Sequence, residues 1–108
     1  MFTFLHSLKG ALGAPNLLIT LGAKGALFYQ HGDPIRQSAY PVEPVDTTGA
    51  GDTFLGAFLA QYSQGQSAER ALQFAAGASA IQVTREGAAP AIPDAKEVMA
   101  FIKSREAP

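Results

Sequence analysis

The chain has 108 residues, of which 47% are hydrophobic and 16% are charged, and its formal net charge is −1. This length holds one domain at most, and the apolar content suits a packed core rather than a disordered tail. The near-neutral charge gives no electrostatic footprint for nucleic acid or an anionic membrane, and the lack of cysteine excludes disulfides, cysteine zinc sites and thiol catalysis.

The N-terminal residues predict no targeting sequence. They lack the basic region and the long apolar run of a signal peptide. The longest strongly apolar stretch, residues 16–21, is far shorter than the roughly 20 residues that cross a bilayer. We therefore expect a cytoplasmic protein with no membrane partner. His6 and His31 lie in unrelated segments without metal-ligand spacing, which favours surface positions for both.

The first predicted element is a helix. Leu5, Leu8 and Leu12 follow one another at i, i+3 and i+7, which places them on one helical face. Gly13 and Pro15 are expected to end this helix.

Strands are predicted next. Residues 17–21 form a short, continuously apolar run, which is typical of a strand buried on both faces. Residues 22–25 predict a turn, residues 26–30 a second strand, and residues 31–34 another turn. Residues 35–45 are expected to be extended but irregular, because two prolines each remove a backbone donor.

Three helices fill the rest of the chain. Apolar residues recur at helical spacing from Phe54 to Tyr62, and Gly65 is a plausible stop. Ser67 is expected to cap a second helix rich in small residues, and Asp94 to open the last one. One face of the second helix carries Leu72, Ala75, Ala76, Ser79 and Val83. The order of elements indicates an α/β layer arrangement that is truncated rather than complete.

Residues 46–54, Asp-Thr-Thr-Gly-Ala-Gly-Asp-Thr-Phe, are the most informative stretch. Extended residues precede them and a helix follows, so the glycines lie where the helix starts. There the N–H groups of Gly49, Ala50 and Gly51 could converge on an anion, helped by the helix dipole. The alternative is an ordinary glycine-rich turn with Asp52 in a favourable first-turn position.

Two commoner phosphate motifs are excluded. The chain contains no Gly-x4-Gly-Lys-Ser/Thr, and Phe54 stands where the dinucleotide fingerprint requires a third glycine. Among phosphate-binding motifs, the remaining interpretation of residues 46–54 is an anion hole with a carboxylate inside it. A carboxylate repels bound phosphates, so its natural task is to accept a proton from an attacking hydroxyl.

Residues 46–54 match the C-terminal signature of the ribokinase-like (phosphofructokinase-B type) carbohydrate kinases. Residues 20–25 resemble the nucleotide loop of that family, and residues 83–93 resemble the segment near the C-terminus of the ribokinases, which favours them within the family. The resemblance spans nearly the whole chain. It implies that residues 1–108 are a single C-terminal nucleotide-binding portion of a ribokinase-like α/β/α sandwich, with a truncated central sheet and helices packed on it.

The resemblance also implies roles for individual residues. Asp52 would be the general base, and Gly49, Ala50 and Gly51 would form the anion hole for the transferred phosphoryl group. ATP with Mg²⁺ would be bordered by Thr20, Gly22, Ala23, Lys24 and Gly25, with Ala76 flanking the base. Taken alone, Lys24 reads more simply as a solvated side chain.

A monovalent-cation site beside the anion hole is implied in the same way, with K⁺ as the ion. Its matching positions are Asp46, the backbone of Thr48, and Gln82, Arg85, Gly87 and Ala91. Ala91 departs from the family, because ribokinases typically offer a serine hydroxyl there, and this leaves cation dependence open. Leu55 also departs, standing where many members have asparagine.

Two functions follow as expectations. The first is ATP-dependent phosphoryl transfer to a sugar hydroxyl, with ribose foremost, by a chain that carries the ATP-binding and catalytic-base portion. The second is a non-catalytic nucleotide-binding or assembly module derived from a sugar kinase. The family's sugar-binding part has no counterpart here, so the sugar is left open. Self-association is expected, because the strand at residues 17–21 lacks its family neighbours.

Overall fold

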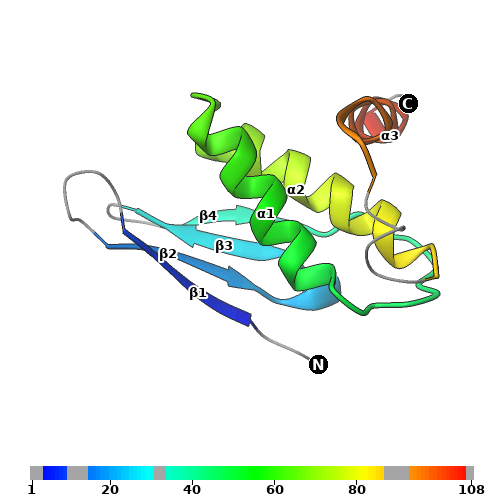
Figure 1. The fold of residues 1–108 in the computed structure, drawn as a ribbon, viewed down its shortest axis with the longest axis horizontal. Helices are drawn as coiled ribbons and strands as arrows, with labels where there is room; N and C mark the ends of the chain where they lie inside the picture. The colour runs from blue at the N-terminus through cyan, green and yellow to red at the C-terminus, as the bar shows by residue number, and fades with distance from the viewer. Residues whose placement is uncertain (1–3, 10–14, 31–33, 87–92, 107–108) are drawn as a thin grey trace.

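The computed structural model of the chain describes residues 4–9, 15–30, 34–86 and 93–106. Four antiparallel strands form one sheet in the order β1-β2-β3-β4, and the helices lie above it (Figure 1). The strands are β1 (Phe4–Lys9), β2 (Pro15–Thr20), β3 (Ala26–Tyr29) and β4 (Ile35–Gln37). A short 3₁₀ helix, η1 (Gly22–Lys24), joins β2 to β3, and the α-helices are α1 (Ala50–Ser63), α2 (Ala68–Val83) and α3 (Ala95–Glu106).

The expectation of a helix around Leu5 and Leu8 was wrong. These residues belong to β1, which pairs antiparallel with β2 from Phe4 opposite Thr20 to Lys9 opposite Pro15. A helix this short is marginal on its own, whereas pairing satisfies backbone groups along a whole edge of β2. The expected helix end at Gly13 lies outside the described residues, as does most of the turn expected at residues 31–34.

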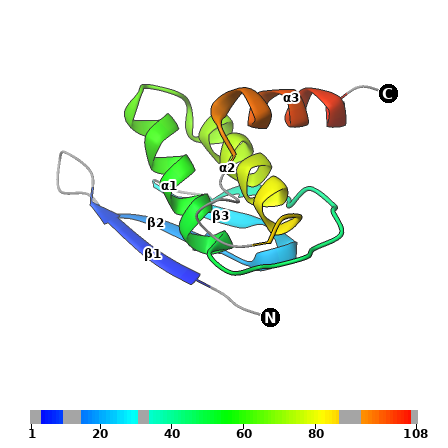
Figure 2. The same cartoon turned by 45° about the vertical axis from the view of Figure 1, so that its right-hand side comes forward.

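The predicted strand at residues 17–21 is present as β2, but the expected burial on both faces was wrong. Leu18 and Thr20 are buried, whereas Leu17 and Ile19 are only half-buried. This alternation is the period-2 pattern of a strand with one covered face. Figure 2 shows the described helices on one side of the sheet. Because β2 is paired on both edges, by β1 and by β3, it offers no open edge for self-association.

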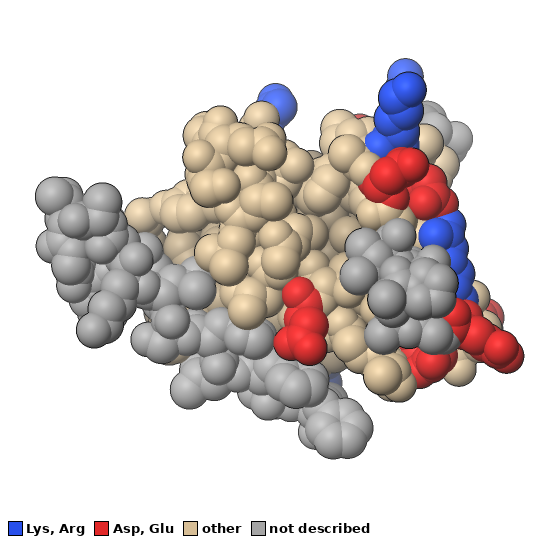
Figure 3. Space-filling model, viewed as in Figure 1, with Lys and Arg blue, Asp and Glu red and all other residues tan. Residues whose placement is uncertain are grey.

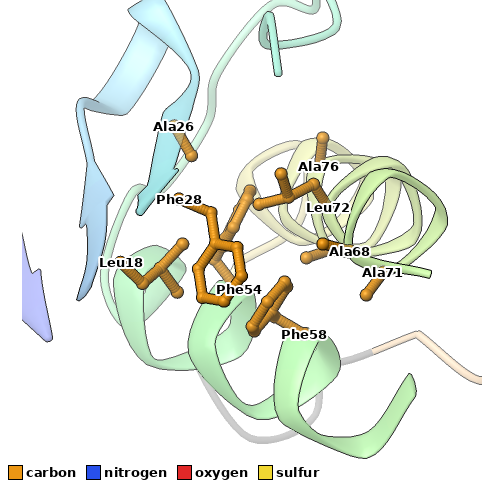
Figure 4. Packing of buried hydrophobic residues seen from close by; sticks show 10 residues of the cluster. Leu18, Ala26, Phe28, Phe54, Phe58, Ala68, Ala71, Leu72 and Ala76 are labelled. Atoms are coloured by element: carbon orange, nitrogen blue, oxygen red, sulfur yellow. The ribbon is translucent and has the colours of Figure 1, made fainter. Parts of the chain in front are cut away.

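The main core lies between the sheet and helices α1 and α2 (Figure 4). Phe28 of β3 contacts Phe58 of α1 with ring centroids 4.8 Å apart, and both side chains are fully buried. Leu18 and Leu72 are also at 0% exposure. Burying a side chain of this size contributes about 1.5–3 kcal/mol. These contacts fix α1, and therefore its N-terminal end, on the sheet.

Helix α3 packs on α2 through Val98 and Ile102. A Cβ at Gly77 of α2 would lie 3.0 Å from Cγ1 of Ile102 and 3.2 Å from Cγ1 of Val98, so the two helices approach closely there. In the part of the chain that the structure describes, no helix is long and apolar enough to cross a membrane.

The helix ends follow the sequence signals. Ser67 caps α2, its Oγ accepting a hydrogen bond from the Arg70 N–H at 3.2 Å. Gly65, with φ 92°, lies just beyond the end of α1. Asp94 and Glu97 cap α3 reciprocally: the Glu97 N–H donates to Asp94 Oδ1 at 2.9 Å, and the Asp94 N–H donates to Glu97 Oε1 at 3.4 Å. The predicted starts of both helices are confirmed.

Candidate functional site

The glycine loop, residues 46–52, includes the first three residues of α1. Gly49 is the N-cap residue and has φ 77° and ψ 4°, a left-handed conformation that is unfavourable for residues with a Cβ. This conformation turns the chain so that the first turn of α1 begins at Ala50. The Ala50 N–H donates to the Thr47 carbonyl at 3.2 Å, and the Thr53 N–H donates to the Gly49 carbonyl at 2.9 Å.

The start of α1 has the features of an anion site. The N–H groups of Gly49, Gly51 and Asp52 donate no hydrogen bond to any of the described residues. Such groups at a helix start carry the positive end of the helix dipole. The Ala50 N–H is engaged with Thr47, so an anion would compete with that bond.

The carboxylate of Asp52 stands at the same end of α1. It is exposed and is the acidic residue of the first turn. Beyond it, a groove of about 460 Å³ runs along α1 and is bordered on its other side by α2 and the start of α3. Its lining includes Asp52, Gly56, Phe74 and Pro93. A carboxylate at a helix start, open to solvent, is placed to meet an incoming polar group.

The last turns of α2 hold the beginning of the glycine loop. The Val83 carbonyl accepts hydrogen bonds from the N–H groups of Val45 at 2.6 Å and Asp46 at 3.0 Å. The Asp46 carboxylate in turn accepts the Thr48 N–H at 2.9 Å, which tightens the chain ahead of Gly49.

Two side chains of α2 reach the rest of the loop. Gln82 Nε2 donates to the Thr48 carbonyl at 3.3 Å, and Ser79 Oγ donates to the Ala50 carbonyl at 3.4 Å. Neither Ser79 nor Val83 was predicted from the sequence to have a role in the site. These residues lie at i−3 and i+1 from Gln82 on the last turns of α2. That spacing indicates a role in holding the loop only after the structure has placed the loop against the helix.

The implied cation residues are brought together in part. Asp46, Thr48 and Gln82 form the connected group just described, at the C-terminal end of α2, where the helix dipole favours positive charge. The Asp46 carboxylate and the Thr48 carbonyl are oxygen donors of the kind that a large monovalent cation accepts. The described residues contain no group of three or more His, Cys, Asp or Glu side chains arranged to hold a metal. Gly87 and Ala91 lie outside the described residues.

Arg85, another implied cation residue, has a side chain that is bonded elsewhere. Its guanidinium forms a two-pronged ion pair with Glu97 of α3. The hydrogen bond from Arg85 lowers the pKa of Glu97, and the same bond raises the pKa of Arg85. Any part that Arg85 plays in a cation site would therefore fall to its backbone carbonyl.

The second candidate loop, residues 20–25, begins at Thr20, the last residue of β2. Thr20 is only 5% exposed, and its Oγ1 has no hydrogen-bond partner among the described residues, which is costly for a buried hydroxyl. Ala23 and Lys24 in η1 are exposed, and Gly22 has φ 58°. Gly25 has φ 101°, and a Cβ there would lie 2.0 Å from the Gln37 carbonyl oxygen.

Ala76 lies in the core between α2 and the sheet and is 4% exposed (Figure 4). Its small side chain lets the helix approach the sheet closely. The structure therefore gives Ala76 a packing role.

Residues 4–95 match the family described as pfkB family carbohydrate kinase. The chain is 48% identical over 94 residues to a ribokinase of Arabidopsis thaliana, which covers 85% of this chain and 25% of that protein. It is 38% identical over 106 residues to a probable fructokinase-3 of the same plant, covering 89% of this chain and 31% of that protein.

Solved structures agree. A ribokinase of Thermotoga maritima superposes with a TM-score of 0.77 at 43% identity, over 82% of this chain and 30% of its own. The Arabidopsis ribokinase complexed with ribose and ATP gives a TM-score of 0.77 at 44% identity, over 80% of this chain and 28% of its own. Within the described residues, the three α-helices and the small antiparallel sheet thus match part of the ribokinase fold. The chain spans about a quarter to a third of the length of these relatives.

Proposed function

Because the chain belongs to the pfkB family of carbohydrate kinases, we propose that it is the ATP-binding and catalytic-base portion of a kinase that phosphorylates a sugar hydroxyl, ribose foremost. The observation that carries the proposal is the start of α1. There the exposed Asp52 carboxylate lies at the same helix end as the N–H groups of Gly49 and Gly51, which donate no hydrogen bond to the described residues.

The N–H groups of Gly49 and Gly51 would bind the transferred phosphoryl group, whose charge builds on its outer oxygens in the transition state. Exchange of the Thr47 carbonyl for a phosphate oxygen would add the Ala50 N–H to this set. Gly49 suits the role because its left-handed conformation excludes a side chain at the point where a phosphate would touch the backbone.

Asp52 would accept the proton of the attacking hydroxyl. A carboxylate is a much weaker base than an alkoxide, so it does not deprotonate a resting hydroxyl. It takes the proton late, once bonding to phosphorus has made that hydroxyl acidic. Positioning of the hydroxyl by Asp52 and charge stabilisation by the loop would supply most of the rate enhancement.

The nucleotide would lie between the two loops. Thr20, whose buried hydroxyl has no hydrogen-bond partner among the described residues, would border it together with the exposed Ala23 and Lys24. A structure of a putative ribokinase II from E. coli, at 41% identity, contains ATP and Mg²⁺. Mg²⁺ bound to the nucleotide would neutralise phosphate charge. This chain's part is to bind the phosphates through backbone N–H groups.

A potassium ion would fit beside the loop. The Asp46 carboxylate and the Thr48 carbonyl would hold it, and the backbone carbonyl groups of Gln82, Arg85, Gly87 and Ala91 are the remaining proposed ligands. The Gln82 carbonyl already accepts the Arg85 N–H at 3.0 Å, so a cation would share this oxygen with that hydrogen bond. A cation there would stabilise the part of the glycine loop between Asp46 and Gly49.

A second candidate function is a nucleotide-binding or assembly module without catalysis. It needs only the N–H groups of Gly49 and Gly51 at the start of α1, which support nucleotide binding with or without catalysis.

Two measurements separate these functions. Titration of the 108-residue chain with ADP, followed by NMR of its backbone amides, should shift the Gly49, Gly51 and Asp52 signals at millimolar nucleotide under either function. For catalysis, the matching segment of the Arabidopsis ribokinase is replaced by this chain, and ADP formation is measured with ATP, Mg²⁺ and ribose, and with fructose for comparison. Turnover supports the kinase. Binding without turnover, in a chimera that folds, supports the module, and no binding contradicts both.

A further inference from the structure

Charged side chains join α2 to α3 in a way that the proposed reaction leaves unexplained. Arg85 follows the last turn of α2, and Glu97 lies in the first turn of α3. Arg85 Nη1 donates to Glu97 Oε1 at 3.4 Å, and Nη2 donates to Oε2, so both carboxylate oxygens are engaged. The two side chains are 38% and 40% exposed. In Figure 3 the acidic and basic side chains gather mainly over the side of the molecule that carries α3.

Contacts that do not involve Arg85 also hold Glu97 in place. Its N–H donates to Asp94 Oδ1 at 2.9 Å, and its Oε1 also accepts the Asp94 N–H at 3.4 Å. Just beyond, Val98 at 0% exposure and Ile102 at 5% pack on α2. Arg85 is therefore bonded to a carboxylate whose backbone and helix are held in place.

The other side of the same helix end holds the glycine loop. The Arg85 N–H donates to the Gln82 carbonyl at 3.0 Å, while the Gln82 side chain donates to the Thr48 carbonyl at 3.3 Å. Next to it, the Val83 carbonyl accepts the Asp46 N–H at 3.0 Å. The stretch from Gln82 to Arg85 thus connects α3 on one side with the loop before Asp52 on the other.

We propose that Arg85 and Glu97 are positioning residues, which hold the end of α2 at a fixed place against α3 and thereby set the conformation of the glycine loop. Neither side chain touches the candidate anion site. They act through Gln82 and Val83, whose hydrogen bonds to the loop require the last turn of α2 to stay in register. The proposal rests on the proposed function only where nucleotide binding is concerned.

The test compares two variants of the 108-residue chain with the same change of charge. Glu97→Gln weakens the pairing with Arg85 but keeps a side chain that suits the third position of a capping box. Asp94→Asn removes a charge at the same end of α3, keeps a favourable N-cap residue and leaves the Arg85–Glu97 bonds intact. The readouts are the amide chemical shifts of Gly49, Gly51 and Asp52 without nucleotide, and then the Kd for ADP.

We expect Glu97→Gln to shift the three loop amides clearly more than Asp94→Asn does, and to weaken ADP binding about two- to fivefold, the scale of an exposed ion pair. The exchanged pair Arg85→Glu with Glu97→Arg should restore both readouts in part. Equal loop shifts in the two single variants would overturn the proposal, even if Glu97→Gln lowered the melting temperature. If Glu97→Gln does not fold, Arg85→Lys, which keeps the charge and loses the two-pronged bond, is compared instead by the same criterion. If the parent chain does not bind ADP, the proposed function fails, and the amide shifts alone decide the positioning role.

Discussion

Replacement of Gly25 by alanine should destabilise the chain severely. Gly25 has φ 101° and ψ −140°, a region that residues with a Cβ avoid, and adopting it costs about 1–3 kcal/mol. The new Cβ would also lie 2.0 Å from the Gln37 carbonyl oxygen and 2.9 Å from the Ala39 nitrogen. These neighbours are backbone atoms, so the chain leaving β4 would have to move, at a further cost of about 1–3 kcal/mol.

The two terms amount to about 2–6 kcal/mol, a large part of the roughly 5–15 kcal/mol that stabilises a domain. The assay is urea unfolding of the 108-residue chain, followed by circular dichroism. The matched control is Gly56→Ala in the middle of α1, where a Cβ would meet nothing within 4 Å. This control should stabilise the chain by about 0.5–1 kcal/mol. A Gly25→Ala chain within about 0.5 kcal/mol of the parent, smaller than the least of the terms above, would refute the reasoning about this loop.

The helix ends and the sheet edges can be tested in the same way. Gly49→Ala forces a residue with a Cβ into a left-handed conformation. It should lower the free energy of unfolding by about 1–2 kcal/mol and weaken ADP binding. Unchanged stability and unchanged ADP affinity would contradict the argument from the left-handed turn. Ser67→Ala removes the acceptor for the Arg70 N–H and should lower the free energy of unfolding in urea by about 0.5–2 kcal/mol. Ser67→Asn should leave this free energy nearly unchanged. Equal losses of stability in the two variants would mean that the cap contributes nothing. Self-association remains expected, now through the outer edges of β1 and β4 rather than through β2, and light scattering should find a dimer or larger species; a clean monomer with a cooperative melt would contradict it.

The helices could be predicted from the sequence because their signals are local. The periodic apolar residues of α1, the serine that caps α2 and the aspartate that caps α3 all act within a few residues of the helix that they specify. The glycine loop was found for the same reason, since its pattern and the helix that follows it are continuous in the chain.

The β1 strand could not be predicted, because its structure depends on a partner. Leu5 and Leu8 have helical spacing, but the unpaired edge of β2 offers more backbone hydrogen bonds than a short helix would keep. The burial of β2 was also misjudged. Leu17 and Ile19 are as apolar as Leu18, and the described helices cover only one of the two faces.

Part of the candidate site was hidden for a similar reason. The hydrogen bonds from Val45 and Asp46 to the Val83 carbonyl join residues far apart in the sequence, as does the bond from Ser79 to the Ala50 carbonyl. No rule of sequence spacing predicts contacts of this kind. They appear only when α2 is placed beside α1.

The central claim, that Asp52 is the catalytic base, is tested most directly by Asp52→Asn in the chimera built on the Arabidopsis ribokinase. Asparagine keeps the shape of the side chain, so the fold should survive. Loss of the proton acceptor should lower kcat about 10²–10⁴-fold, or roughly 3–5 kcal/mol. The affinity for ADP should hold or rise, because a negative charge beside the phosphates is gone. If Asp52 serves only the start of α1, the change would alter stability by about 0.3–1 kcal/mol and leave kcat unaltered. A folded Asp52→Asn chimera with near-normal kcat would contradict the account.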